Sequence, residues 1–339
     1  MKKLFVFLGI VFMAVGSAVS AQEVDSTVPL QKSSWGDAKT SESVDYMPEI
    51  SLDMRGSYRQ GFTSGSGQFI GDELYLDING YITPYISYSL NHRIAAPYYG
   101  EGITGFDATN WLTLTYELGN FAFTAGKDAL LVGSFEYDAY DLDSYYDMNS
   151  DFYNNFDCWQ WGASVAWTMF ETQELILQVA NSPYSYGESG LFSYALAWRG
   201  YWDFYESYWT ANLWQYDAGR FTKAINAGNR FYAGNLTMDL DLMFRIDEAG
   251  VDINGFTGTF APSYQFKDWG RLFAKAGWDS TPNAWFYGAG FEYFPFKDYT
   301  DLRLHAAYMH NASTIGDILN IGITWKMNLT RNIRRLLSR

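Results

Sequence analysis

One acidic segment carries the main chemical signal of this sequence. Between Lys127 and Arg199 there is no lysine, arginine or histidine, and carboxylates are frequent. The acids that we single out as candidate site residues are Glu136, Asp138, Asp141, Asp143, Asp147 and Asp151. Acidic side chains that line a narrow passage favour cations, whereas arginine and lysine favour anions. The segment therefore suits electrostatic selection of small solutes.

Basic residues at mid-strand positions elsewhere form the second candidate set. They are Arg55, Arg59, Arg93, Lys127, Arg245, Lys275, Arg303 and Lys326. If the strands that hold them enclose water, acid on one wall and base on the other set a field across the bore. We hypothesise a passage that disfavours small anions and mildly favours cations or neutral solutes.

Other chemistry has weaker support. His310 lies near Ser313, which could suggest an outer-membrane hydrolase, but nucleophilic catalysis needs an oriented base and oxyanion donors that no spacing here indicates. Cys158 is the single cysteine, so it cannot form an internal disulfide, and a packed side chain is the simpler interpretation. We predict no enzyme.

A calcium-loop motif begins at Asp147 and then fails. Its sixth position is Phe152 and its twelfth is Cys158, where glycine and glutamate are required. No glycine-rich phosphate cradle opens a helix. We expect no cofactor, and a Ca²⁺ ion held between loop carboxylates is left open.

The elements that position these charges are strands. Apolar and polar residues alternate with the period of two that is typical of β-strands. Sixteen segments show it: 50–61, 69–82, 85–94, 107–117, 120–127, 157–168, 173–181, 191–202, 205–215, 221–232, 236–247, 255–266, 271–279, 284–294, 300–309 and 317–328. No convincing helix separates them.

The faces and the connections of these strands indicate a membrane barrel. In 236–247, apolar residues such as Leu240 and Leu242 alternate with Asp239 and Asp241. Short and long connections tend to alternate, as tight turns and outer loops do in such barrels. Aromatic residues gather where strands meet turns: Tyr85, Trp202, Phe204, Trp269, Phe294, Phe296 and Tyr299. A soluble β-sandwich also alternates, but these features favour an all-β, sixteen-stranded antiparallel transmembrane β-barrel.

The N-terminal segment indicates where the protein is located, and the net charge limits the class of partner. Lys2 and Lys3 precede an apolar stretch, Leu4 to Val19, and small residues that suit cleavage after Ala21. We read residues 1–21 as a signal peptide rather than a membrane anchor, 22–49 as a polar periplasmic lead-in, and 50–329 as the barrel. The formal net charge of −15 argues against a nucleic-acid partner.

The longest connection, Asp128 to Phe156, is the expected constriction. Structureless loops of more than about 12–15 residues are usually functional or disordered, and this one is rich in tyrosine and phenylalanine. We expect it to fold inward as an acidic eyelet; the alternative is an outer loop on the rim. Barrels of about 16–18 strands leave an aqueous channel, unless the loop plugs the bore and the protein serves a structural or surface-binding role.

Several stretches resemble the porin O/P family of outer-membrane barrels found in Bacteroidetes-type bacteria. They include "TAGKDALLVGSFEYDAYD", which contains Lys127, and "FEYFPFKDYTDLRLHAAY", which contains Arg303. The resemblance implies a passive channel of sixteen strands in the outer membrane of a Gram-negative bacterium. It also implies contact with outer-membrane lipid, passage of small hydrophilic solutes or ions, and in many members a homotrimer.

Two departures from the family pattern limit what is carried over. Phosphate-selective members have basic residues on the inward loop, and here that loop has none after Lys127, so phosphate selectivity is not expected. The chain also continues past Trp325 into a basic tail, residues 330–339, with four arginines. The tail could lie against anionic headgroups, form a helical turn in the periplasm, or fray.

Overall fold

The computed structural model describes most of the chain. It describes residues 44–95, 105–139, 143, 145–185, 190–246, 255–281, 283–296, 302–312 and 316–337. The predicted signal peptide, most of the polar lead-in and Asp141 lie outside the described residues.

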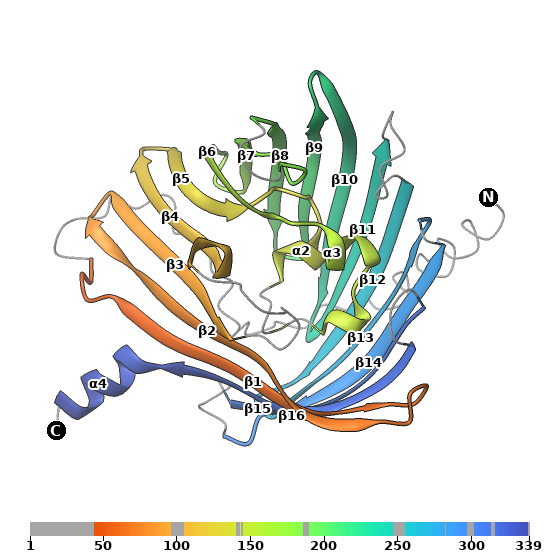
Figure 1. Cartoon of the computed structure of the whole chain (residues 1–339). Coiled ribbons are helices and arrows are strands. Elements are labelled where there is room, and N and C mark those ends of the chain that lie inside the picture. Colours follow the sequence, from red (N-terminus) through yellow and green to blue (C-terminus); the bar gives the residue numbers. More distant parts are fainter. Residues whose placement is uncertain are drawn as a thin grey trace.

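Sixteen antiparallel strands form one closed sheet (Figure 1). They are β1 Glu49–Gly61, β2 Gly67–Thr83, β3 Ile86–Ala95, β4 Thr109–Leu118, β5 Phe121–Ala129, β6 Trp159–Met169, β7 Gln173–Asn181, β8 Phe192–Trp202, β9 Tyr205–Asp217, β10 Arg220–Ala233, β11 Leu236–Ile246, β12 Gly255–Phe266, β13 Gly270–Asp279, β14 Ala284–Tyr293, β15 Leu302–Asn311 and β16 Gly316–Asn328. The predicted sixteen-stranded antiparallel barrel is confirmed, with strand ends that differ from expectation by two residues or fewer.

The first and last strands close the barrel. β1 pairs with β16 in a continuous register from Ser51 opposite Asn328 to Gly61 opposite Ile318. Every strand pairs with its sequence neighbour elsewhere in the ring. Closure leaves no sheet edge with unpaired N–H and C=O groups, which is the requirement for a sheet surrounded by an apolar medium.

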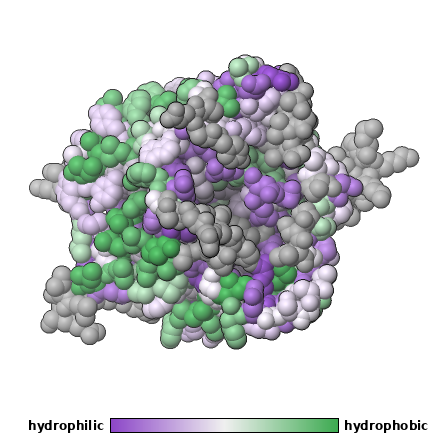
Figure 2. Space-filling view, in the orientation of Figure 1, coloured by the Kyte–Doolittle hydropathy of each residue, from purple (hydrophilic) through white to green (hydrophobic). Residues whose placement is uncertain are grey.

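The inner face of the sheet is polar and the outer face is apolar, which is the reverse of a soluble protein. On β2, Tyr75 and Asp77 point into the ring and are buried, while Leu74, Leu76 and Ile78 on the outer face are partly exposed. Many charged side chains of other strands are buried inside, and many large apolar side chains are exposed outside. Figure 2 shows the same division, with hydrophilic residues around the central hollow and hydrophobic residues on the outer flank at the left.

The short turns share one end of the barrel with the beginning of β1 and the end of β16. Gly119 and Gly234 lie in two of these turns with φ of 57° and 62°, a backbone region that glycine adopts without steric cost. Five of the aromatic residues expected at this rim are exposed there: Tyr85, Trp202, Phe204, Trp269 and Phe296. Phe294 is instead buried, and Tyr299 lies outside the described residues.

Short helices interrupt the connections, where the sequence predicted none. The long β5–β6 connection contains α2 Phe135–Asp138, the 3₁₀ turn η3 Tyr146–Met148 and α3 Asp151–Asn155. The 3₁₀ turn η1 Gly105–Ala108 precedes β4, and α4 Leu329–Leu337 follows β16. Among the residues described, no helix combines the length and the apolar character needed to cross a membrane.

Candidate constriction inside the barrel

The β5–β6 connection turns into the ring of strands instead of standing on its rim. It leaves the wall after Ala129 and returns to it at Trp159. In Figure 1, α2 and α3 lie within the circle of strands. We call residues 130–158 the inward loop. Its predicted inward fold is confirmed, and its side chains contact the inner wall at several separate places.

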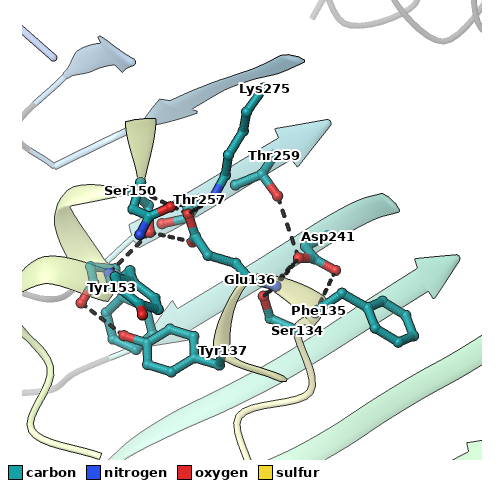
Figure 3. Close-up of polar contacts among 12 residues, drawn as sticks. Ser134, Phe135, Glu136, Tyr137, Ser150, Tyr153, Asp241, Thr257, Thr259 and Lys275 are labelled. Atoms are coloured by element: carbon teal, nitrogen blue, oxygen red, sulfur yellow. Dashed lines mark hydrogen bonds and ion pairs between the residues drawn. The ribbon is translucent and has the colours of Figure 1, made fainter. Parts of the chain in front are cut away.

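The carboxylate of Asp241 on β11 holds the start of α2. It accepts hydrogen bonds from the Ser134 hydroxyl at 2.7 Å, the Phe135 amide at 3.1 Å and the Glu136 amide at 2.9 Å (Figure 3). Free N–H groups at the first turn of a helix favour a nearby anion. The start of α2 is therefore bound to the wall by three hydrogen bonds to one carboxylate.

Glu136 joins two parts of the inward loop to β13. Its carboxylate accepts hydrogen bonds from the Ser150 amide at 2.9 Å and the Ser150 hydroxyl at 2.6 Å, and it pairs with Lys275 (Figure 3). The Lys275 ammonium also donates to the Asn149 side-chain oxygen at 2.7 Å. Because the Glu136 side chain is only 1% exposed, this pair is shielded from solvent.

Three further loop acids form ion pairs with the wall. Asp138 lies 2.7 Å from the Arg199 guanidinium on β8. Asp147 pairs with Arg59 on β1.

The third of these acids, Asp143, contacts the wall of the last two strands. It pairs with Arg303 on β15 and lies 2.8 Å from the Lys326 ammonium on β16. Four of the acids predicted from sequence therefore contact wall bases directly. Four of these bases were also predicted, and the fifth, Arg199, was not.

Apolar packing holds the same loop against two parts of the wall. Near its ends, the loop packs against β7, β9, β10 and β11 in a cluster of Leu130, Val132, Phe152, Phe156, Ala180, Trp214, Ala224 and Met243. In its middle, Tyr145 and Met148 pack against Ala307, Met309 and Ile318 of β15 and β16. The loop consequently crosses the interior from the β7–β11 side to the β15–β16 side.

Arginine–aromatic contacts reinforce this packing. The Arg245 guanidinium lies 4.1 Å from the centre of the Phe152 ring, and that of Arg55 lies 4.8 Å from the Tyr145 ring. A guanidinium over an aromatic face is attracted by the ring quadrupole. Arg55 and Arg245, which were predicted from sequence as wall charges, thus contact rings of the loop.

The remaining predicted site residues lie apart from these contacts. The Arg93 guanidinium donates to the Tyr75 hydroxyl at 3.1 Å and stands 3.6 Å from the Glu73 carboxylate. The Lys127 ammonium donates to the Phe106 carbonyl at 2.7 Å. Asp151 opens α3, and its amide donates to the Asp279 carboxylate at 2.6 Å.

Two loop carboxyls have opposite electrostatic surroundings. Burial alone would raise the pKa of Asp143, but the nearby Arg303 and Lys326 charges outweigh burial and hold that pKa well below its ordinary value. Burial raises the pKa of Asp147 above its ordinary value even though Arg59 opposes the shift. Asp143 therefore keeps its charge in acid, while Asp147 loses its charge earlier than an exposed aspartate.

Sequence reasoning missed several wall residues that hold the loop. They are Arg199, Asp241, Asp279 and Glu292, whose carboxylate accepts a hydrogen bond from the Tyr145 hydroxyl at 3.2 Å. Each is a charged residue at an inward position of a strand. The alternation of apolar and polar residues in 236–247 already placed Asp241 on the polar face. That alternation does not show which atom of the loop a wall residue contacts.

The residues considered for other chemistry have ordinary partners. The Cys158 side chain packs beside the apolar cluster at the ends of the loop. The His305 ring is 2.8 Å from the Asn320 side-chain oxygen, and the His310 ring is 2.9 Å from the Asp317 carboxylate. Within the described part of the chain, no group of three or more His, Cys, Asp or Glu side chains is placed to hold a metal ion.

Comparison with solved structures finds porins. A mutant of the Rh. blastica porin with three substitutions is 13% identical, with a TM-score of 0.57 over 83% of this chain and 100% of that one. A second structure, described under "Asymmetric conductivity of engineered proteins", also has 13% identity, a TM-score of 0.57 and the same coverage. At this identity the likeness shows the fold: a porin-like, sixteen-stranded barrel.

Two other comparisons find no relatives. No protein-family model matches the chain. No curated protein matches it either.

Proposed function

We propose that this protein is an outer-membrane porin through which small hydrophilic solutes diffuse passively. The observation that carries the proposal is the reversed polarity of the sheet, with apolar side chains exposed outside and charged side chains gathered inside. An outward apolar surface on a closed barrel suits a bilayer, and a polar interior suits water. The porin fold of the structural neighbours supports the same function.

We propose further that the inward loop is the constriction and that it disfavours small anions. The inward loop contains no lysine, arginine or histidine. The wall bases Lys275, Arg303, Lys326 and Arg59 are engaged by loop carboxylates. Bases that are neutralised in this way contribute less to anion attraction, so a mild preference for cations or neutral solutes is expected.

Single-channel recording in a planar bilayer tests both parts of the proposal. The refolded protein should give steady open current in symmetric salt. In a salt gradient, the reversal potential should have the sign of cation selectivity. A clear chloride or phosphate preference would contradict the selectivity, and the absence of open current would contradict the channel itself.

A plugged barrel with a structural or surface-binding role is the second candidate. The packing of the inward loop favours it, because Phe135, Met243 and Trp214 inside the ring are almost completely buried. Liposome swelling with sugars of increasing size separates the two functions. A channel admits the smaller sugars at rates that fall with size, whereas a plugged barrel admits none.

Membership of the porin O/P family, an outer-membrane location and a trimeric assembly remain proposals that rest on the sequence resemblance and the porin fold. A trimer of channels should close in three equal steps under high voltage. Catalysis is not part of the proposal, because the fold neighbours are porins. Ser313, which was considered beside His310 for a hydrolase, lies outside the described residues.

A further inference from the structure

The C-terminal helix α4 follows the last strand of the barrel and has an apolar and a basic side. Residues 329–337 read LTRNIRRLL. With 3.6 residues per turn, positions 329, 333, 336 and 337 fall on one side, and these are leucine or isoleucine. Positions 331, 334 and 335 fall on the other side, and all three are arginine. The helix is therefore amphipathic and basic in a chain whose net charge is −15.

Contacts at its first turn fix where α4 begins. The Asn328 side-chain oxygen accepts a hydrogen bond from the Arg331 amide at 2.7 Å and so caps the helix. The Thr330 hydroxyl donates to the Pro48 carbonyl at 2.7 Å and accepts from the Ile50 amide at 2.9 Å. These contacts tie the helix to the start of β1, at the end of the barrel where the short turns lie.

The same end of the barrel carries the exposed aromatic side chains Tyr85, Phe170, Phe204, Trp269 and Phe296. In membrane barrels such aromatic residues mark the level of the lipid headgroups. Figure 1 shows α4 directed away from the ring of strands instead of across the lumen. Ile333, on the apolar side of the helix, is 46% exposed. A helix at headgroup level with an exposed isoleucine and a basic face has the form of an interfacial helix.

We propose that α4 is a membrane-surface anchor that binds anionic lipid headgroups of the leaflet at the short-turn end of the barrel. Its apolar side enters the headgroup region, and the positive charge of its other side is attracted to the anionic phosphate groups. The inference goes beyond passive diffusion, although it depends on the proposed membrane location. A charged lipid is favoured over a protein partner because the aromatic rim places the helix beside lipid.

A fluorescent probe on the apolar side of α4 tests the proposal. The full chain with Cys158→Ser and Ile333→Cys is labelled with an environment-sensitive dye and reconstituted into phosphatidylcholine vesicles with or without phosphatidylglycerol. We expect blue-shifted emission and quenching by lipid-borne quenchers in the anionic vesicles, with a smaller effect in phosphatidylcholine alone and a decrease at high salt. The matched control carries Ser64→Cys in the exposed β1–β2 turn at the opposite rim and should stay in water in both.

Charge variants give the second measurement. The double variant R331Q/R335Q keeps the Arg334–Asp45 ion pair and should weaken partitioning of the probe into anionic vesicles about fivefold for each arginine removed. A probe at position 333 that stays in water in anionic vesicles overturns the proposal, as does quenching that is independent of lipid charge and salt. Conductance of the unmodified chain, recorded in bilayers of the same lipid composition, separates the two questions. Open current there together with a water-exposed probe at position 333 refutes the anchor alone, whereas the absence of open current refutes the channel.

Discussion

Lys326, on the last strand of the barrel, places its ammonium 2.8 Å from the carboxylate of Asp143 in the inward loop. Asp143 pairs at the same time with Arg303 on the neighbouring strand. The contact joins the middle of the loop to the wall that closes the barrel, far along the chain from the strands that the loop connects. The position of the constriction is thus set by charge pairing as well as by the loop's own ends.

Replacement of Asp143 by Asn should loosen the middle of the loop. Arg303 and Lys326 lose their loop carboxylate, so two positive charges face the lumen with less compensation. We expect noisier open-channel current and a reversal potential displaced toward anion selectivity. Single-channel recording measures both. Asp138→Asn, which removes the ion pair of Arg199 on the other side of the barrel, is the matched control and should leave Asp143 in contact with Arg303 and Lys326. Unchanged noise and selectivity in D143N would show that the pairs do not position the loop.

The Glu136–Lys275 pair should be strongly coupled. Removal of one member of a shielded pair costs about 3–5 kcal/mol, because it leaves the other charge uncompensated. Glu136→Gln and Lys275→Met should each lower the free energy of unfolding in detergent by that order. The double variant should lose less than the sum of the two. Denaturant titration of the four proteins measures the coupling, and additive losses would mean that the two charges do not interact.

The strands could be predicted from sequence because a period of two is a local property. Leu240 and Asp241 are adjacent in the chain and face opposite sides, and the pattern around them shows this without any knowledge of the neighbouring strands. The inward loop was also predicted, since its length and aromatic content exclude a simple turn.

The contacts of the loop could not be predicted in the same way. Asp147 meets Arg59 on β1, and Asp241 caps α2. Both contacts depend on how the loop folds across the ring, which alternation in the strands does not encode. The helices α2 and α3 are only four and five residues long, too short for a helical period to show. α4 was left open among three alternatives because nine residues of an arginine-rich tail carry little pattern.

The polarity of the sheet predicts opposite results for two adjacent positions on β4. Leu114 faces outward and is 48% exposed, whereas its neighbour Thr113 faces the interior. Leu114→Arg places a charge in the bilayer and should cost about 2–4 kcal/mol of folding free energy in lipid. Thr113→Arg should fold and shift the channel toward anions. Refolding into lipid vesicles, followed by heat-modifiable mobility on gels, measures folding. Equal tolerance of both arginines would argue that the outer face does not contact hydrocarbon.

The selectivity of the channel should depend on pH through Asp147. Its pKa is raised by burial, so the carboxyl takes up a proton above the ordinary aspartate value of about 3.9. As the pH falls through that raised value, the loop loses a negative charge and the charge of Arg59 is compensated less. The reversal potential should therefore move toward anions in mildly acidic solution. Asp143 should not contribute in this range, because its pKa is held low and its charge persists.

Variants separate the two carboxyls. The pKa of Asp157 is also raised by burial, so Asp147→Asn should remove part of the acid-induced shift and leave a remainder. Asp143→Asn should change selectivity already at neutral pH and should still show an acid-induced shift. Reversal potentials from neutral pH to about pH 4 supply the measurement. An acid-induced shift that is the same in D147N as in the unmodified protein would show that Asp147 does not titrate there.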